Sequence, residues 1–307
     1  MLTLAAGLDY VDLNFLGVPE VIATAVLHHA SGVALIDPGP STTHESLKES
    51  LRKKGISIAD VRQVLLTHIH LDHAGVTGTL VRENPGIEVI VHERGAPHMI
   101  DPAKLLASAG RLYGADMDRL WGDFVPVPGT RVRTLTGGER IAVAGRELEV
   151  AYTPGHASHH VSYFDAASRV AFVGDTAGIR RTGRDYIMPP TPPPDIDLDA
   201  WRVSEDRILA WEPDTLFLTH FGPFHGARMH FQDMTVRLEA WSAIVRRLLA
   251  DPALDEEGRQ RAFVDEAILD LRRKVGEQAA DRYSRAGRLD YSWQGLSRYW
   301  RKRLDKG

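Results

Sequence analysis

Four side chains that commonly bind metal ions lie within six residues of the sequence. The segment His68-Ile69-His70-Leu71-Asp72-His73 contains three histidines and one aspartate. His68 and His70 are two residues apart on an expected extended segment, so their rings can point to the same side. Asp72 and His73 come at the start of an expected helix, which lets one short loop present two sub-sites. Imidazole and carboxylate groups suit zinc, iron or manganese, and the chain has no thiolate that would select otherwise.

Three more potential ligands follow apolar runs further along the chain. His156 comes after Thr-Pro-Gly, Asp175 after Gly and His220 after Thr, each just beyond a run typical of a strand. Taken singly, each of these residues has an ordinary interpretation as a capped or surface position. Seven donors that each close an apolar strand together predict a metal site, because α/β proteins collect ligands at the carboxyl ends of strands.

Short strands and helices must position these donors. Apolar and β-branched runs predict strands directly ahead of them, over residues 61–66, 148–152, 170–173 and 215–218. Further strands are predicted over 21–27, 33–36, 87–91, 141–143 and 161–164, and helices over 44–54, after 73, irregularly over 97–124, and around 201–209. Five prolines between residues 188 and 194 predict a loop that joins neither a sheet nor a helix.

The chain changes character after residue 230. Apolar residues from Phe231 to Leu248 recur three and four positions apart, which predicts one apolar stripe along a helix. Two more helices are expected around 263–275 and 293–304. We therefore expect a catalytic domain over 1–230 and a helical C-terminal extension over 231–307, with net charges of −7 and +3. Acidic residues interleave with the basic ones in the extension, so we expect packing rather than nucleic-acid binding.

The composition excludes several classes of protein. Apolar residues make up 43% of the chain and the net charge is −4, so we expect an ordered protein without a general attraction to nucleic acid. No apolar run approaches the ~20 residues that span a bilayer, and no membrane partner is expected. The absence of cysteine excludes disulfides, a cysteine nucleophile and an iron–sulfur cluster. Residues 1–10 lack the basic start of a signal peptide, so a cytoplasmic location is expected.

The order of the motifs resembles that of the metallo-β-lactamase superfamily. The series H-x-H-x-D-H, P-G-H, G-D and T-H matches over roughly residues 20–225, and Asp37 in Leu35-Ile36-Asp37-Pro38-Gly39 resembles that superfamily's first motif. The resemblance implies an α/β fold, the αββα four-layer sandwich. Two mixed sheets would lie face to face, with helices outside, metals at one edge and a C-terminal helical extension.

The resemblance also implies a division of the donors between two metal ions. The first ion would be held by His68, His70 and His156. The second would be held by Asp72, His73 and His220, and Asp175 would bridge the two. We expect two divalent cations, zinc in the first place, with iron or manganese as alternatives.

Such a pair of ions indicates hydrolysis. Two metals about 3.5–4 Å apart can lower the pKa of a bridging water toward ~7 and stabilise charge on a carbonyl oxygen. We expect the metal-bridging hydroxide to attack an acyl ester, a lactone or a thioester, while Asp72 relays a proton to the leaving group. Asp72 and Asp175 are the expected catalytic residues. The protein would be a dinuclear metal-dependent hydrolase of a small-molecule substrate.

Three other functions stay open from the sequence. A mononuclear iron oxygenase resembling persulfide dioxygenases would use only the first sub-site and the bridging aspartate. A phosphodiesterase or nuclease would need a basic groove, which the charge of −7 on residues 1–230 disfavours. A metal-binding protein without catalysis would have no open coordination position. Self-association into a homo-oligomer is also left open.

Substrate contacts are expected close to the last two motifs. Glyoxalase II resembles this chain in the full donor set and in its helical C-terminal domain. It has a Lys and a Tyr shortly after its bridging Asp, and Arg184 and Tyr186 lie at comparable distances. It also has a Tyr where this chain has Gly222. Phe221, together with the proline-rich loop, is expected to form an apolar wall for an acyl chain. The expected substrate-binding residues are Arg184, Tyr186 and Phe221.

Overall fold

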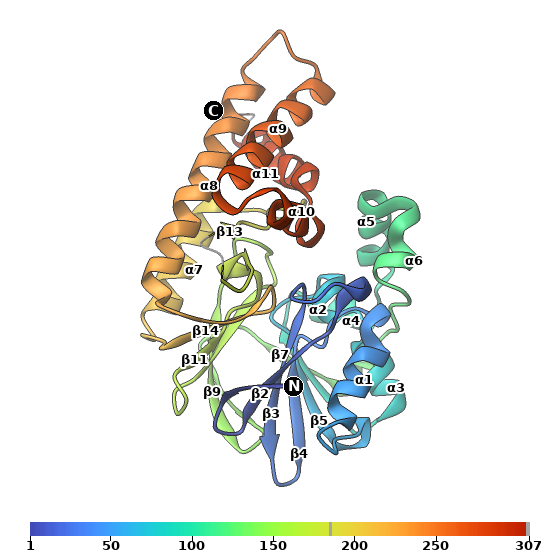
Figure 1. The fold of residues 1–307 in the computed structure, drawn as a ribbon. Helices are drawn as coiled ribbons and strands as arrows, with labels where there is room; N and C mark the ends of the chain where they lie inside the picture. The colour runs from blue at the N-terminus through green and yellow to red at the C-terminus, as the bar shows by residue number, and fades with distance from the viewer. Residues whose placement is uncertain (184–185, 305–307) are drawn as a thin grey trace.

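Two β-sheets pack face to face in the centre of the molecule (Figure 1). The computed structural model describes residues 1–183 and 186–304. Within them, the first sheet has the order β1 (Leu2–Ala5), β2 (Leu8–Asp12), β3 (Ala23–His29), β4 (Gly32–Ile36), β5 (Val61–Leu65), β6 (Glu88–His92) and β7 (Val132–Leu135). The second has the order β15 (Gly222–His225), β14 (Thr215–Leu218), β11 (Val170–Phe172), β10 (Val161–Asp165), β9 (Arg146–Tyr152) and β8 (Arg140–Val143).

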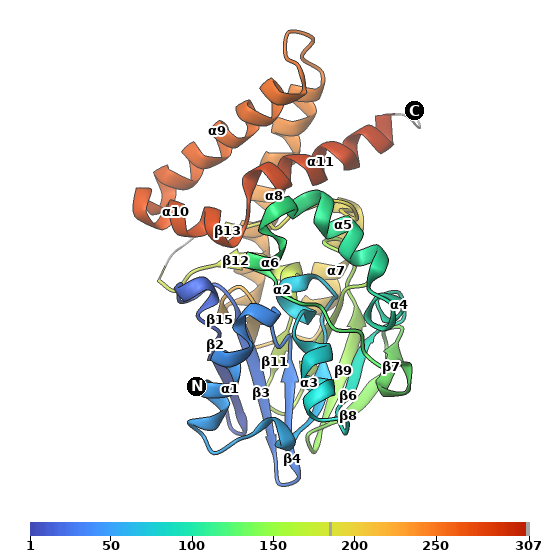
Figure 2. The same cartoon turned by 90° about the vertical axis from the view of Figure 1, so that its right-hand side faces the viewer.

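Helices cover the outer face of each sheet, which completes the predicted αββα sandwich (Figures 1 and 2). The helices beside the first sheet include α1 (His44–Arg52), α2 (Leu71–Ala74), α3 (Thr77–Glu83) and α4 (Ala96–Ile100). Those beside the second are α7 (Leu198–Leu209) and α8 (Ala227–Leu249). On the side of the sandwich where the donor-carrying strands end lie α5 (Ala103–Tyr113), α6 (Met117–Leu120), α10 (Glu277–Ala286) and α11 (Leu289–Leu304), with α9 (Glu256–Val275) further out (Figures 1 and 2).

The central strands are buried on both faces. Along β3, Ala25 and Leu27 face the core between the two sheets, whereas Val26 packs with the helices on the outer side. Along β4, Ile36 faces inward and Leu35 outward in the same way. Strands that are covered on both faces are apolar at nearly every position, which is why these segments could be recognised from composition alone.

Several elements differ from the sequence-based expectation. β1, β2 and β15 were not predicted, and α10 forms a separate helix between the two expected ones. The first C-terminal helix begins at Ala227, a few residues before the expected stripe. Met188 pairs with Ile179 in the short ribbon of β12 (Ile179–Arg180) and β13 (Ile187–Met188), so the loop begins one residue later than predicted. The prolines that follow Met188 lack the N–H needed to extend that ribbon.

The C-terminal helices stand beyond the strand ends that carry the donors (Figure 2). Their apolar stripes join one core with α7 and the outer face of the second sheet, and this core buries Trp201, Trp241, Phe263 and Trp293.

In the described ranges, no helix combines the length and the apolar composition needed to cross a membrane.

Glu205 in α7 is a buried carboxyl group that makes stability depend on pH. It is 7% exposed, and its Oε2 accepts a hydrogen bond of 2.7 Å from the Thr235 hydroxyl in α8. Its Oε1 has no hydrogen-bond partner in the part of the chain that the structure describes, and burial raises the pKa of Glu205 from 4.5 to about 7. Because the folded chain holds this proton more tightly than the unfolded chain, stability is lost as pH rises through that interval and is not regained above it.

We therefore compare the free energy of unfolding of Glu205→Gln with that of the unsubstituted protein. The difference is expected to be more favourable to the variant at pH 8 than at pH 5, by about 2 kcal/mol. Urea unfolding of both proteins at the two pH values measures this difference. Glu93→Gln, which changes an exposed glutamate, should show no such dependence on pH. An equal effect of Glu205→Gln at pH 5 and pH 8 would show that the carboxyl group is ionised throughout.

Candidate metal centre

Strand directions bring the seven donors to one edge of the sandwich. β10 is antiparallel to both β9 and β11, and β11 is parallel to β14. The strands β9, β11 and β14 therefore run in the same direction and end at the same edge of the sheet. His156 follows β9, Asp175 follows β11 and His220 follows β14. The loop after β5 meets this edge through a hydrogen bond of 2.8 Å from the Val161 N–H to the Thr67 carbonyl oxygen. That loop carries His68 and His70, and the helix α2 that follows it carries Asp72 and His73.

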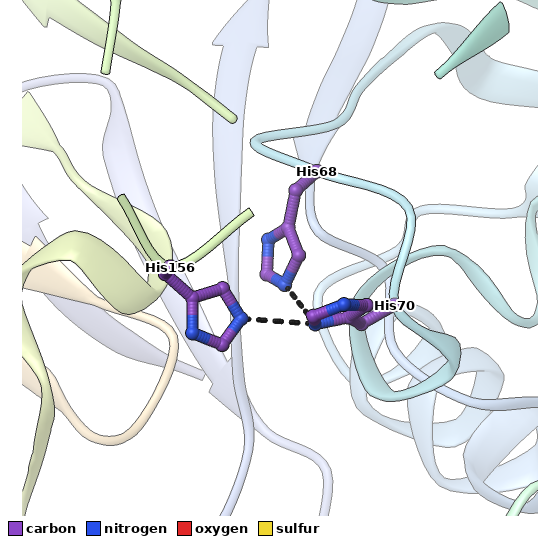
Figure 3. Close-up of side chains that lie close together, drawn as sticks. All are labelled: His68, His70 and His156. Atoms are coloured by element: carbon purple, nitrogen blue, oxygen red, sulfur yellow. Dashed lines mark hydrogen bonds between the residues drawn. The ribbon is translucent and has the colours of Figure 1, made fainter. Parts of the chain in front are cut away.

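Three imidazoles form the first group of donors (Figure 3). His70 Nδ1 lies 3.0 Å from His68 Nε2 and 2.9 Å from His156 Nε2. Burial, and then the neighbouring rings, lower the pKa of His68 well below its ordinary value and that of His70 to about 4. The rings are therefore neutral at pH 7 and their inner nitrogens can offer lone pairs to one cation.

The second group combines one carboxylate with two imidazoles. Asp72 Oδ2 lies 3.3 Å from His220 Nε2 and 3.7 Å from His73 Nε2. Burial alone would raise the pKa of Asp72, but the two neighbouring imidazoles lower it to about 2. The carboxylate is therefore ionised at neutral pH.

Asp175 stands between the two groups and faces each with a different oxygen. Its Oδ1 is 3.2 Å from His73 Nε2 and 3.5 Å from His220 Nε2. Its Oδ2 is 3.3 Å from His156 Nε2. The side chain of Asp175 is 5% exposed, so the carboxylate is held inside the cluster and not at its rim.

A second layer of hydrogen bonds turns the donor nitrogens inward. The outer ring nitrogen of His73 donates to Asp37 Oδ2 at 2.9 Å, that of His156 to the Pro190 carbonyl at 2.8 Å and that of His220 to the Val21 carbonyl at 2.7 Å. Each of these bonds fixes the tautomer and leaves Nε2 facing the cluster, which is how proteins orient metal-binding histidines.

The donor atoms fit a pair of divalent cations. His73 Nε2 and Asp175 Oδ1 are buried 3.2 Å apart, and neither makes a well-formed hydrogen bond to any described residue, although buried polar atoms are rarely left unpaired. The groups able to hold an ion among the described residues include His68 with His70 and His156, and Asp72 with His73 and His220. A cation in each group would give these atoms a partner.

Asp37 connects two of the strand ends that carry donors. It is fully buried, and its carboxylate accepts hydrogen bonds from the Thr67 hydroxyl at 2.7 Å and the Thr219 hydroxyl at 2.8 Å besides the bond from His73.

Asp37→Asn is expected to weaken metal binding about 10–100-fold, because an amide cannot hold the His73 ring as the carboxylate does. Competition with a chromogenic chelator measures this loss. As a control, Asp60→Asn changes a partly exposed aspartate and should leave metal affinity unchanged. Unchanged affinity in Asp37→Asn would show that the Asp37 carboxylate is not needed to hold the His73 ring.

A cavity of about 480 Å³ opens above the donors and has His70, Asp72, His156, Asp175 and His220 among its lining residues. Besides the proline-rich loop, three distant segments build its walls, namely the loop after β2, the α5–α6 region and the start of α11. Their main contributions are Phe15, Leu16, Val18, Tyr113, Trp121 and Tyr291. These six residues were not predicted, and the poor periodicity over 97–124 was the one sequence signal of an irregular, functional segment. The proline-rich loop, which was expected to form a wall, does line the cavity through Pro190, Thr191 and Pro192.

The expected substrate-binding residues lie elsewhere or are not described. Tyr186 is completely buried in the C-terminal core, where its hydroxyl lies 3.3 Å from Asp270 Oδ2 and the Arg237 guanidinium lies 3.6 Å from its ring centre. Phe221 packs edge-on against Tyr10 between the sheets, with ring centres 6.2 Å apart. Neither side chain is among the described residues that line the cavity. Arg184 lies outside the described residues.

The comparisons with known proteins agree with the fold and the donor set. A family model described as the metallo-beta-lactamase superfamily matches residues 18–220, and the chain belongs to this superfamily. The metallo-beta-lactamase fold-containing protein ST1585 of Sulfurisphaera tokodaii is 26% identical over 231 residues, which cover 70% of this chain and 78% of that protein. The solved structure of the metallo-beta-lactamase family protein TTHA1429 from Thermus thermophilus has the same fold, with a TM-score of 0.72 at 21% identity over 98% of this chain and 95% of that one.

A hydroxyacylglutathione hydrolase of Synechococcus is a further relative, 28% identical over 151 residues. The match covers 49% of this chain and 46% of that enzyme, so the chain spans about half of its length. Together these relationships confirm the predicted family and the prediction of a metal-dependent hydrolase.

Proposed function

We propose that the protein is a dinuclear metal-dependent hydrolase acting on an acyl ester, a lactone or a thioester. The placement of Asp175 carries this proposal, because its two oxygens face two separate groups of donors. The apolar-walled cavity over the donors supports an acyl substrate, and the relative named as a hydroxyacylglutathione hydrolase supports a thioester. Residues 1–230 would form the catalytic domain and residues 231–307 the helical extension that closes the cavity from above.

Each cation has a defined set of residues in this proposal. The first would be held by His68, His70 and His156. The second would be held by Asp72, His73 and His220, with Asp175 shared between the two. Zinc is the first candidate, and iron or manganese suit the same ligands. When bound, such a pair supplies a water nucleophile at neutral pH and stabilises negative charge on the substrate oxygen.

The residues around the donors orient the substrate and move the proton. The side chain of Asp72 is 22% exposed and reaches the cavity, where an ionised carboxylate can take up a proton and pass it to the leaving group. Phe15 and Trp121, stacked with ring centres 5.6 Å apart, form an apolar wall that excludes water from the acyl chain. The substrate carbonyl would therefore meet the donors in a largely dry site.

A substrate panel with measured metal content tests the proposal. Purified protein, with its metals quantified by mass spectrometry, is assayed against lactones, S-acylglutathiones, simple esters and bis-p-nitrophenyl phosphate. We expect two metals per chain and hydrolysis of at least one acyl substrate. Hydrolysis confined to the phosphodiester would contradict the proposed reaction. A single iron with consumption of oxygen would contradict both the dinuclear state and hydrolysis.

A further inference from the structure

A second chamber adjoins the cavity over the donors. It has a volume of about 500 Å³ and shares His70, Tyr113 and Pro192 with the first cavity, so the two meet beside the metal donors. We call the first the acyl cavity and the second the basic chamber. A linear substrate that extends from one into the other passes directly over His70.

The basic chamber gathers cations that have no carboxylate partner. Its lining includes Arg94, Lys104, Arg111 and Arg298. Asp195 is the one acidic residue among the described residues of this lining, and it accepts a hydrogen bond of 2.6 Å from the Ser158 hydroxyl. Within the described residues, none of these four cations forms an ion pair. A chain whose net charge is −4 thus concentrates four unpaired positive charges at one entrance to its centre.

The cations of the acyl cavity are arranged differently. Arg119 pairs with Asp116 at 3.0 Å and Arg288 pairs with Asp290 at 2.7 Å, so both are neutralised by their own neighbours. The remaining wall is largely aromatic and aliphatic. The acyl cavity therefore suits an apolar group, and the basic chamber suits an anionic one.

We propose that the substrate is a thioester of a polyanionic carrier of the coenzyme A type, a flexible polar arm that ends in phosphate groups. This inference rests on the proposed function and specifies its substrate. The acyl chain occupies the acyl cavity, the thioester carbonyl lies at the donors and the carrier runs out through the basic chamber. Lys104 and Arg111 on α5 and Arg298 on α11 then face the phosphates from two sides.

Two further observations support a long polar ligand in the basic chamber. His159 lines it with 8% of its surface exposed, which adds an imidazole to the polar wall of the chamber. The chamber also continues into a neighbouring hollow that shares Arg94, Ser158 and Asp195 and adds Lys302. This continuation leaves room for the nucleotide end of the carrier.

The reaction balances as a simple hydrolysis. A water oxygen forms the new bond to the carbonyl carbon, the carbon–sulfur bond breaks, and the thiolate takes up a proton. The products are a carboxylate, which leaves the acyl cavity, and the free thiol of the carrier, which leaves the basic chamber.

Three thioesters with the same acyl group test the proposal on the metal-loaded protein: octanoyl-coenzyme A, S-octanoylglutathione and the neutral S-octanoyl-N-acetylcysteamine. We expect kcat/KM for the coenzyme A ester to exceed that for the neutral ester by about 10²-fold at low ionic strength, and this advantage to shrink as salt is added. The double substitution Lys104→Glu and Arg298→Glu should lower the ratio of the two kcat/KM values at least ~10-fold, chiefly through KM.

A matched control changes the same net charge elsewhere. Lys54→Glu with Arg82→Glu alters two exposed cations on the helical layer of the first sheet and should leave the ratio unchanged. Equal kcat/KM for the charged and neutral esters, or a ratio that the Lys104 and Arg298 substitutions leave unchanged, would overturn the carrier assignment while the proposed hydrolase stands. Failure to hydrolyse any of the three, with turnover of a lactone, would overturn the carrier assignment and leave an ester hydrolase. Failure on every acyl substrate would overturn both.

Discussion

Asp175→Ala is expected to remove one of two bound metals per chain and to lower kcat/KM by at least ~10³-fold. Loss of an outer residue that merely orients a ligand typically costs 10–100-fold, and a side chain placed to contact both cations must cost more. The structure gives the reason, since no other carboxylate among the described residues faces both His156 and His73. The effect should appear in metal content and in turnover together.

Metal analysis and kinetics on the same preparation measure this prediction, with circular dichroism to confirm that the variant is folded. Asp175→Asn is a useful companion because it keeps the shape of the side chain while removing its charge. It should retain more metal than the alanine variant and still lose most activity. Two metals and full turnover in Asp175→Ala would show that the carboxylate does not bridge the two groups.

Removal of the metals is expected to abolish hydrolysis and to lower the melting temperature by about 10 °C. A ligand present at a hundredfold excess over its Kd adds about 2.7 kcal/mol of stability, and two sites add about twice that. For a domain of this size each kcal/mol corresponds to roughly 2 °C. Without cations, the inner atoms of His73 and Asp175 would also stay buried without a well-formed hydrogen bond to any described residue.

Dialysis against a chelator followed by scanning calorimetry measures the change. Addition of zinc, iron or manganese should restore both the melting temperature and turnover, and the metal that restores kcat/KM most fully identifies the best cofactor. Added calcium serves as the control, because it prefers oxygen ligands and should restore neither. Full activity in the chelated protein would exclude metal-dependent hydrolysis altogether.

The metal donors could be predicted from sequence because each lies directly beside a strong local signal. β11 and β14 are buried at every position and β5 is buried at its last two residues, so their apolar runs end at the donors that follow. The H-x-H-x-D-H segment adds four donors with a spacing that one loop and one helical turn can present. No long-range information was needed to find these residues, although their convergence depends on both sheets.

Apart from the proline-rich loop, the walls of the cavity could not be predicted, because they come from segments that meet only in the folded chain. Tyr291 on α11 packs edge-on against Tyr113 on α5, with ring centres 5.4 Å apart. These two residues are so far apart in the sequence that no local pattern could indicate their contact. Tyr186 illustrates the opposite case. Its distance from Asp175 along the chain indicated a site residue, but burial against Arg237 and Asp270 holds it in the C-terminal core.

The most direct test of the paired metal centre is anomalous X-ray diffraction from crystals of the protein as purified, recorded at the absorption edge of each metal found. We predict two anomalous peaks. One should lie within about 2.0–2.2 Å of the inner atoms of His68, His70 and His156, and the other at similar distances from those of Asp72, His73 and His220. Asp175 should contact both. A single peak in fully loaded crystals, or peaks away from these side chains, would contradict the account.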